Sequence, residues 1–123
     1  MTLQDNTLEV LAITADHVLR KITVAGGEEG IRAAIACSGL SRFDIRHGVA
    51  IWFDRHHSDP SRRPNMAAVC LMTNCSDADP QTMPIPNDVI VLTGTDSATR
   101  RPRTLRPDQY RALAYTLYGS EVA

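Results

Sequence analysis

The sequence predicts a single domain of the α+β class, with two N-terminal helices, a small sheet of about three short apolar strands and a C-terminal closing helix. The length of 123 residues fits one domain over 1–123 better than two. Proline is absent from the first 59 residues, and six of the seven prolines fall between Pro60 and Pro102. Long uninterrupted elements are therefore expected first, and short elements joined by stiff loops later.

The first helix is expected between Asn6 and Gly26. Asn6 is a favourable cap, and Glu9 stands where a capping box places its acidic partner. Gly26 and Gly27 would end the helix. Six apolar residues recur at helical spacing and would form its buried face: Leu8, Leu11, Ala15, Val18, Leu19 and Ile22.

A second helix is expected from about Glu28 to Ser38. Glu28 and Glu29 would lie at the positive end of its dipole. Gly39 suits the left-handed residue that ends many helices. The inward face would consist of Ile31, Ala34 and Ile35.

The segment SRFDIRHGVAIWFDRHH, residues 41–57, has two interpretations. In the favoured one, Ser41 and Asp44 cap a short helical turn that ends at Gly48, and VAIWF follows as a buried strand. The β-branched and aromatic residues and the helix-breaking glycine support it. In the alternative, one longer helix buries a common face of Ile45, Val49, Trp52, Phe53 and His56.

Two further apolar runs, Met66–Thr73 and Asp88–Thr95, are bounded by turn residues and predict strands. Because they lack polar alternation, both of their faces should be covered. The closing helix is expected from Pro107 to about Tyr118, since proline suits the first helical position and Gly119 the exit.

The stretch FDRHHSDPSRRPN, residues 53–65, carries the groups most suggestive of chemistry. Imidazoles and carboxylates are ligands for divalent metals, and four lie here: Asp54, His56, His57 and Asp59. On an extended chain adjacent side chains point to opposite sides, so the two histidines are poorly placed to share one ion. We expect instead a polar loop that displays Arg55, Arg62 and Arg63.

Cysteine offers a second metal option. Cys70 and Cys75, with His56 or His57, have the residue types of a zinc site, but the second closely spaced pair typical of structural zinc is missing. Buried free cysteine ordinarily behaves as a small hydrophobe. We therefore expect no metal and no cofactor.

Residues 31–48 read IRAAIACSGLSRFDIRHG, which resembles the helix-turn-helix of DNA-binding proteins. A helix would end at Gly39 and a second would begin at Ser41. The resemblance implies that three side chains of the second helix face the major groove: Arg42, Arg46 and His47. Ile35 and Gly48 depart from the family's pattern, which has a small residue at the first position and an apolar residue at the second.

A third feature is ATRRPRTLRPDQYR, residues 98–111, in which Arg100, Arg101, Arg103 and Arg106 lie within seven residues. Pro102 stiffens the segment, so the guanidinium groups should be displayed rather than buried. Such a patch suits a phosphate backbone or an acidic protein surface.

The composition narrows the classes of function. A net charge of −1 creates no overall field that would attract nucleic acid or an acidic membrane. The N-terminus lacks the pattern of a signal peptide, no apolar run is long enough to span a bilayer, and the three cysteines form no disulfide framework, so a cytoplasmic protein is expected. Twelve arginines against one lysine indicate a GC-rich gene of bacterial, phage or mobile-element origin.

The sequence thus predicts a small non-catalytic regulatory protein that binds another protein through arginine-rich loops. The residues expected at that interface are Arg55, Arg62, Arg63, Arg100, Arg101 and Arg103. The alternatives are a DNA-binding regulator using residues 28–47 and a metal-dependent hydrolase using His56 and His57. A homodimer formed through a strand edge is a further possibility.

Overall fold

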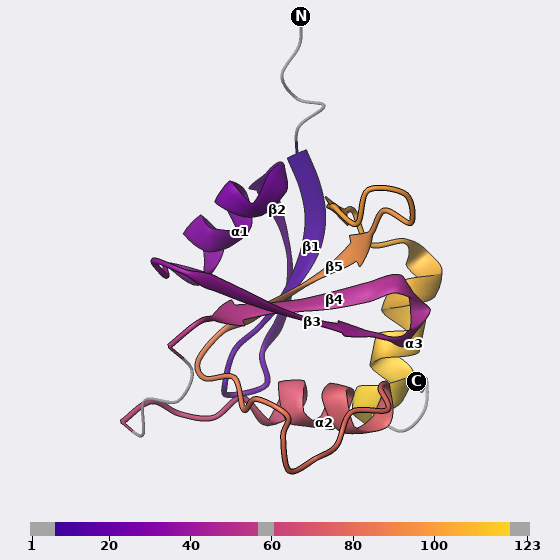
Figure 1. Ribbon diagram of the computed structural model, residues 1–123. Helices are drawn as coiled ribbons and strands as arrows, with labels where there is room; N and C mark the ends of the chain where they lie inside the picture. The colour runs from indigo at the N-terminus through magenta and orange to yellow at the C-terminus, as the bar shows by residue number, and fades with distance from the viewer. Residues whose placement is uncertain (1–6, 57–60, 119–123) are drawn as a thin grey trace, which may run out of the picture.

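A six-stranded antiparallel sheet forms the centre of the protein (Figure 1). The computed structural model describes residues 7–56 and 61–118. The strands are β1 (Thr7–Ile13), β2 (Leu19–Ala25), β3 (Leu40–Ile45), β4 (Val49–Asp54), β5 (Ile90–Thr95) and β6 (Pro102–Arg103). They lie in the order β2-β1-β5-β4-β3, and β6 pairs with the end of β5.

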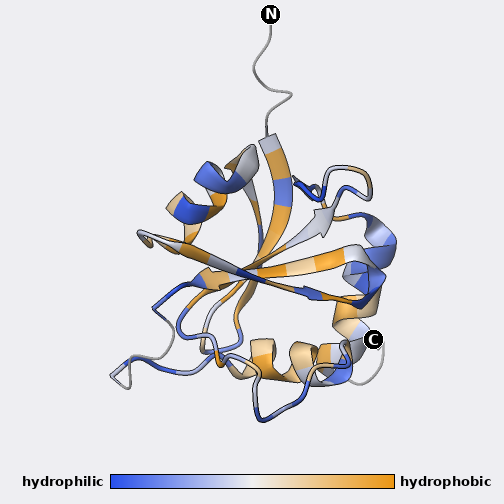
Figure 2. Ribbon diagram, viewed as in Figure 1, coloured by the Kyte–Doolittle hydropathy of each residue, from blue (hydrophilic) through white to orange (hydrophobic). Residues whose placement is uncertain are grey.

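The helices cover both faces of this sheet (Figure 1). Helix α1 (Gly27–Ile35) lies on one face, and α2 (Met66–Asn74) and α3 (Pro107–Tyr118) lie on the other. A short 3₁₀ turn at Arg46–Gly48 joins β3 to β4. Figure 2 shows the consequence for hydropathy, with apolar residues along the central strands and α2, and polar residues in the loops.

Each face of the sheet has its own core. Beneath α1, Ile31 and Ile35 pack with Trp52 of β4. On the opposite face, Leu71 of α2 packs in a larger core that contains Phe53. Because successive strand residues point to opposite faces, Trp52 and Phe53 belong to different cores although they are neighbours in sequence.

The predicted N-terminal helix is wrong, since residues 7–25 form the β1–β2 hairpin. All residues of Val10–Ile13 are buried because β1 lies between β2 and β5 with helices on both faces. A strand that is apolar on both faces shows no period of two, so the helical spacing of its apolar residues is coincidental. The chain reverses where the Thr14 carbonyl accepts the His17 N–H at 2.9 Å. The predicted cap, Asn6, lies outside the described residues.

The strand predicted over Met66–Thr73 is also wrong, because this run forms α2. Its alanine, leucine and methionine residues favour a helix, and a short apolar run does not by itself distinguish a buried strand from a buried helix. Asn65 caps the helix, and its Oδ1 accepts the N–H of Ala68 at 3.1 Å.

The hairpin of β3 and β4 settles the two interpretations of residues 41–57. Val49–Asp54 is the expected strand, and the longer helix is wrong. The helical turn expected from Ser41 shrinks to the 3₁₀ turn, because Leu40–Ile45 pairs with β4 as a strand. Gly48, with φ of 70°, adopts the left-handed conformation that closes the hairpin.

Three further predicted elements are present. The strand over Asp88–Thr95 corresponds to β5, and the helix over Pro107–Tyr118 to α3. The helix predicted over Glu28–Ser38 is α1, but Ala36 rather than Gly39 takes the left-handed conformation after it, with φ of 62°. The predicted arrangement as a whole is nevertheless wrong: the described residues form an α+β domain that begins with strands and contains a six-stranded sheet.

Gly30 supports the docking of α1 onto the preceding strand. A Cβ atom at this position would overlap the carbonyl oxygen of Ala25, a backbone atom. In a solvent-facing helix, alanine is about 1 kcal/mol more favourable than glycine. For Gly30→Ala we expect the opposite sign, a loss of about 1–3 kcal/mol in the free energy of unfolding, because α1 must shift.

Urea denaturation of Gly30→Ala would measure this loss. Glu29→Ala, an exposed change in the same helix, should stay within about 0.5 kcal/mol of the wild type. A stabilised Gly30→Ala protein would contradict the close packing described.

Candidate protein-interaction surface

The predicted interface arginines fall into two groups at opposite ends of the sheet. In the antiparallel pairing of β4 and β5, Trp52 lies opposite Val91 and Val49 opposite Gly94. Arg55, Arg62 and Arg63, which follow β4, therefore lie near the start of β5, whereas the segment 96–103 follows the end of β5. A strand of six residues spans roughly 20 Å, so the two groups of arginines do not form one continuous surface.

Arg62 in the first group holds the fold together. Its Nη1 lies 2.8 Å from Oδ2 of Asp54, and its Nη2 lies 2.6 Å from Oδ2 of Asp88. The hydrogen bonds to Asp54 and Asp88 raise the pKa of Arg62. With two carboxylates already bound, Arg62 has little capacity left for a partner.

The other two arginines of this group lie at the surface. Arg63 forms an exposed ion pair with Asp16 at 2.6 Å. Arg55 is exposed, and its guanidinium lies beside Gly39. The backbone N–H of Arg55 donates to the Gly39 carbonyl at 2.9 Å.

The second group lies on a tightly folded loop. Oδ1 of Asp96 accepts the N–H groups of Ala98 at 2.8 Å and of Thr99 at 3.0 Å. The backbones of Asp96 and Arg101 are also bonded, with the N–H of Asp96 donating to the Arg101 carbonyl at 2.8 Å. These hydrogen bonds lower the pKa of Asp96, the one from Thr99 more than the one from Ala98. The loop thus presents its arginines from a fixed backbone.

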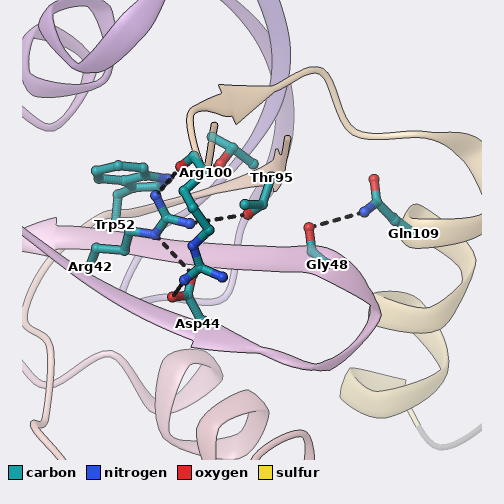
Figure 3. Close-up of polar contacts among 8 residues, drawn as sticks. Arg42, Asp44, Gly48, Trp52, Thr95, Arg100 and Gln109 are labelled. Atoms are coloured by element: carbon teal, nitrogen blue, oxygen red, sulfur yellow. Dashed lines mark hydrogen bonds and ion pairs between the residues drawn. The ribbon is translucent and has the colours of Figure 1, made fainter. Parts of the chain in front are cut away.

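Arg100 connects this loop to the sheet (Figure 3). Its Nη2 lies 2.6 Å from Oδ2 of Asp44 on β3, and its carbonyl accepts Nη1 of Arg42 at 2.6 Å. Arg42 in turn binds Oδ1 of Asp44 through Nε at 2.8 Å. Arg100 has a φ of 66°, a conformation that non-glycine residues rarely adopt.

Trp52 forms the floor of this cluster. The guanidinium carbon of Arg42 lies 5.1 Å from the centre of the indole ring, within the range of a cation–π contact. The indole N–H donates to Oγ1 of Thr93 at 2.9 Å. Arg42, Asp44 and Trp52 are thereby held in place by the sheet (Figure 3).

Gln109 fixes the segment that leads into α3. This side chain is buried, and its Nε2 donates to the His47 carbonyl at 2.8 Å. It also donates to the Gly48 carbonyl at 3.2 Å (Figure 3). Its Oε1 accepts the N–H of Arg106 at 2.9 Å. The start of α3 is therefore anchored to the β3–β4 turn.

Beside this anchor lies an open groove of about 520 Å³, which runs between the start of β1, the end of β5 and residues 102–107. Arg103 and Arg106 contribute to its lining. Arg103 is 3.8 Å from Asp96, and Arg106 is 3.0 Å from Asp108, with all four side chains at or near the surface. Such exposed pairs are weak and can be replaced by carboxylates of a partner.

Arg101 is the most available guanidinium of the loop. It is exposed, and its side chain makes no hydrogen bond or ion pair with any residue in the described part of the chain. Together with Arg103 of the adjoining strand β6, it belongs to the segment 96–103 that carries the sheet-bound Arg100. These three are the predicted interface residues that the structure brings together.

The residues proposed for metal binding do not gather. Within 7–56 and 61–118, no three His, Cys, Asp or Glu side chains lie close enough to hold a metal ion. His57 and Asp59 lie outside those residues. Sγ of Cys75 is 3.5 Å from Oγ1 of Thr116, so this thiol lies in the core between α2 and α3.

The pKa of the Cys37 thiol is raised, chiefly by burial and secondly by the charge of Asp54.

The predicted helix-turn-helix is not formed. The first helix is α1, but the residues expected to form the recognition helix are strand β3 and the turn after it. Arg42 lies over Trp52 on the sheet, and Arg46 pairs with Asp77 at 2.7 Å. The three side chains expected in the major groove therefore do not share a helix face.

Sequence reasoning missed the cluster around Trp52. The signal lay in the short alternation of Phe43, Asp44 and Ile45 and in the glycine after His47, which together are typical of a hairpin. The register of that hairpin places Arg42 opposite Trp52.

These features define a small α+β domain that presents an ordered arginine-bearing loop. Comparisons with protein-family models, curated proteins and solved structures found no match for this chain. Among the residues that the structure describes, no helix is both long and apolar enough to cross a membrane.

Proposed function

We propose that the protein is a small non-catalytic regulatory module that binds an acidic segment of another protein through the loop carrying Arg100, Arg101 and Arg103. The observation that supports this most is the exposure of Arg101 without a carboxylate partner among the described residues. A guanidinium offers a planar fork of donors that matches a carboxylate.

The fixed loop favours binding. Asp96 and the Arg100–Asp44 contact order the backbone before a partner arrives. Less conformational entropy is then lost when the complex forms. The groove lined by Arg103 and Arg106 provides space beside the loop for an extended acidic segment.

The proposal predicts that Arg101→Glu/Arg103→Glu weakens the complex at least about tenfold, because both charges would repel an acidic partner. Proteins captured from cells of the source organism by the wild type and by this variant would be compared by quantitative mass spectrometry. The affinity of the purified partner would then be measured by calorimetry at low and high salt. Binding should weaken as salt rises, since the contacts are exposed.

The matched control is Arg55→Glu/Arg63→Glu, which reverses two exposed charges at the other end of the sheet. It should capture the same partner as the wild type, and both variants should melt like the wild type. If a partner binds Arg101→Glu/Arg103→Glu but not the control variant, the interface lies at the end of the sheet that carries Arg55 and Arg63, which contradicts the proposal. The proposal is overturned if the wild type captures no protein whose binding is weakened in Arg101→Glu/Arg103→Glu and unchanged in Arg55→Glu/Arg63→Glu.

A further inference from the structure

Strand β3 forms one outer edge of the sheet, and one side of its backbone faces no other strand of the described chain. Its residues Leu40–Phe43 are half-buried and Asp44 is exposed. An edge of this kind is a template for pairing with another chain.

The hydrogen-bonding pattern shows which groups of β3 point outward. The Arg55 N–H donates to the Gly39 carbonyl, and this pair continues the β3–β4 register by one residue. Antiparallel pairs alternate between hydrogen-bonded and non-hydrogen-bonded. Ser41, Phe43 and Ile45 therefore bond to β4, whereas the N–H and C=O groups of the intervening residues, Leu40, Arg42 and Asp44, point away from it.

The sequence of this edge is complementary to itself. When two β3 strands meet antiparallel with Phe43 opposite its own copy, Arg42 of each chain lies opposite Asp44 of the other. The backbone N–H and C=O groups of Arg42 and Asp44 point outward, so each Arg42–Asp44 pair between the two chains is a hydrogen-bonded pair. Opposite charges across a strand pair are favourable, and so are paired aromatic rings. A register centred on Arg42 would instead oppose two arginines.

The other edge of the sheet lacks this property. On β2, Arg20 and Lys21 are the charged residues of Leu19–Ala25, and both are positive. A positively charged edge strand is a common means of preventing strand pairing. Charge therefore distinguishes β3 from β2 as a self-pairing edge.

We propose that two copies of the chain associate through antiparallel pairing of their β3 strands, centred on Phe43, to form one continuous sheet. The residues that specify the register are Arg42, Phe43 and Asp44. Arg101 and Arg103 take no part in this association. Asp44 also binds Arg100 of the loop proposed above to bind a partner, so a cross-link at position 43, which leaves Arg42 and Asp44 unchanged, tests the dimer separately from partner binding.

A charge-swap series tests the register in the full-length protein. Analytical ultracentrifugation of the wild type should give the mass of two chains. Arg42→Asp and Asp44→Arg should each give a monomer, because like charges then oppose each other across the two-fold axis. The double variant Arg42→Asp/Asp44→Arg restores both opposite-charge pairs and should be a dimer again. Melting curves of the monomeric variants would show that they remain folded.

A thiol cross-link tests the geometry without changing the charges. Phe43→Cys should form a disulfide between two chains under mild oxidation, because Cα atoms of a non-hydrogen-bonded pair lie about 4.5 Å apart, within disulfide range. Ser41→Cys is the control, since its two copies would be separated by roughly 14 Å along the strands. Mass spectrometry would distinguish the expected bond from bonds of the native cysteines.

A wild type that stays monomeric at high concentration overturns the proposal. So does a dimer that tolerates both single charge reversals, because its interface must then lie elsewhere. Cross-linking through position 41 rather than position 43 overturns the register.

Discussion

Asn65→Asp should lower the free energy of unfolding by about 3–5 kcal/mol, because the change removes two buried hydrogen-bond donors and introduces a charge. Asn65 is fully buried, and its Nδ2 donates to the carbonyls of Ile13 at 3.0 Å and Asp88 at 2.6 Å. Aspartate has nearly the same shape and keeps the acceptor that caps α2 through Ala68. It would, however, turn a carboxylate oxygen toward two carbonyl oxygens.

Asn74→Asp provides the matched comparison for this prediction. It is the same chemical change at the exposed end of the same helix, where Nδ2 of Asn74 bonds to the Cys70 carbonyl at 2.8 Å. A negative charge there opposes the helix dipole and should cost under about 1 kcal/mol. Chemical denaturation of both variants would measure the difference. Equal costs would mean that the buried amide does not link β1, α2 and the chain before β5 as described.

Asn65 also shows why part of the fold was not predictable from the sequence. Asn65 directly before Met66 is a helix-start signal, because asparagine is a favourable N-cap. What decided between strand and helix was the burial of Leu71 and Met72 against the sheet, which depends on residues far away in the chain. By contrast, the proline at the first position of α3 is a local signal, and that helix was predicted within its observed bounds.

The hairpin of β1 and β2 could not be recognised from periodicity. Val10 and Ala12 face one core while Leu11 and Ile13 face the other, so every position is apolar. Such a segment satisfies a helical pattern as well as an extended one. The turn at Thr14, where Oγ1 accepts the Val18 N–H, is the local feature that distinguishes them.

The candidate interface was predictable only in part. A display of arginines in the segment after β5 follows from its composition and from Pro102. That Arg62 instead binds Asp54 and Asp88 depends on the end of β4 meeting the start of β5, a long-range pairing. An arginine cluster in a sequence therefore does not show which guanidinium groups are free to bind a partner until the carboxylates paired with them are known.

Arg62→Ala should cost about 2–4 kcal/mol of unfolding free energy, because it leaves the carboxylate of Asp54 buried without its cation. The Asp54 side chain is 10% exposed and that of Arg62 is 26% exposed, so some access to water keeps the loss below that of a fully buried pair. Arg63→Ala is the neighbouring control. Its pair with Asp16 is exposed on both sides, and its loss should cost at most about 0.5 kcal/mol.

The dependence of this loss on pH separates the charge effect from lost packing. Burial raises the pKa of Asp54, but the hydrogen bonds from the His56 N–H and from Arg62, with the Arg62 charge, outweigh it, so the net pKa lies below its ordinary value. A carboxyl group with a lowered pKa in the folded state stabilises the protein above its unfolded pKa of about 3.9, and that stability disappears as the pH falls through the folded pKa. The gap between the wild type and Arg62→Ala should therefore be full at pH 7 and shrink below about pH 4, where Asp54 becomes neutral in the variant first and then in the wild type. A gap that stays constant from neutral to acidic pH would show that Arg62 acts through its packing and not through Asp54.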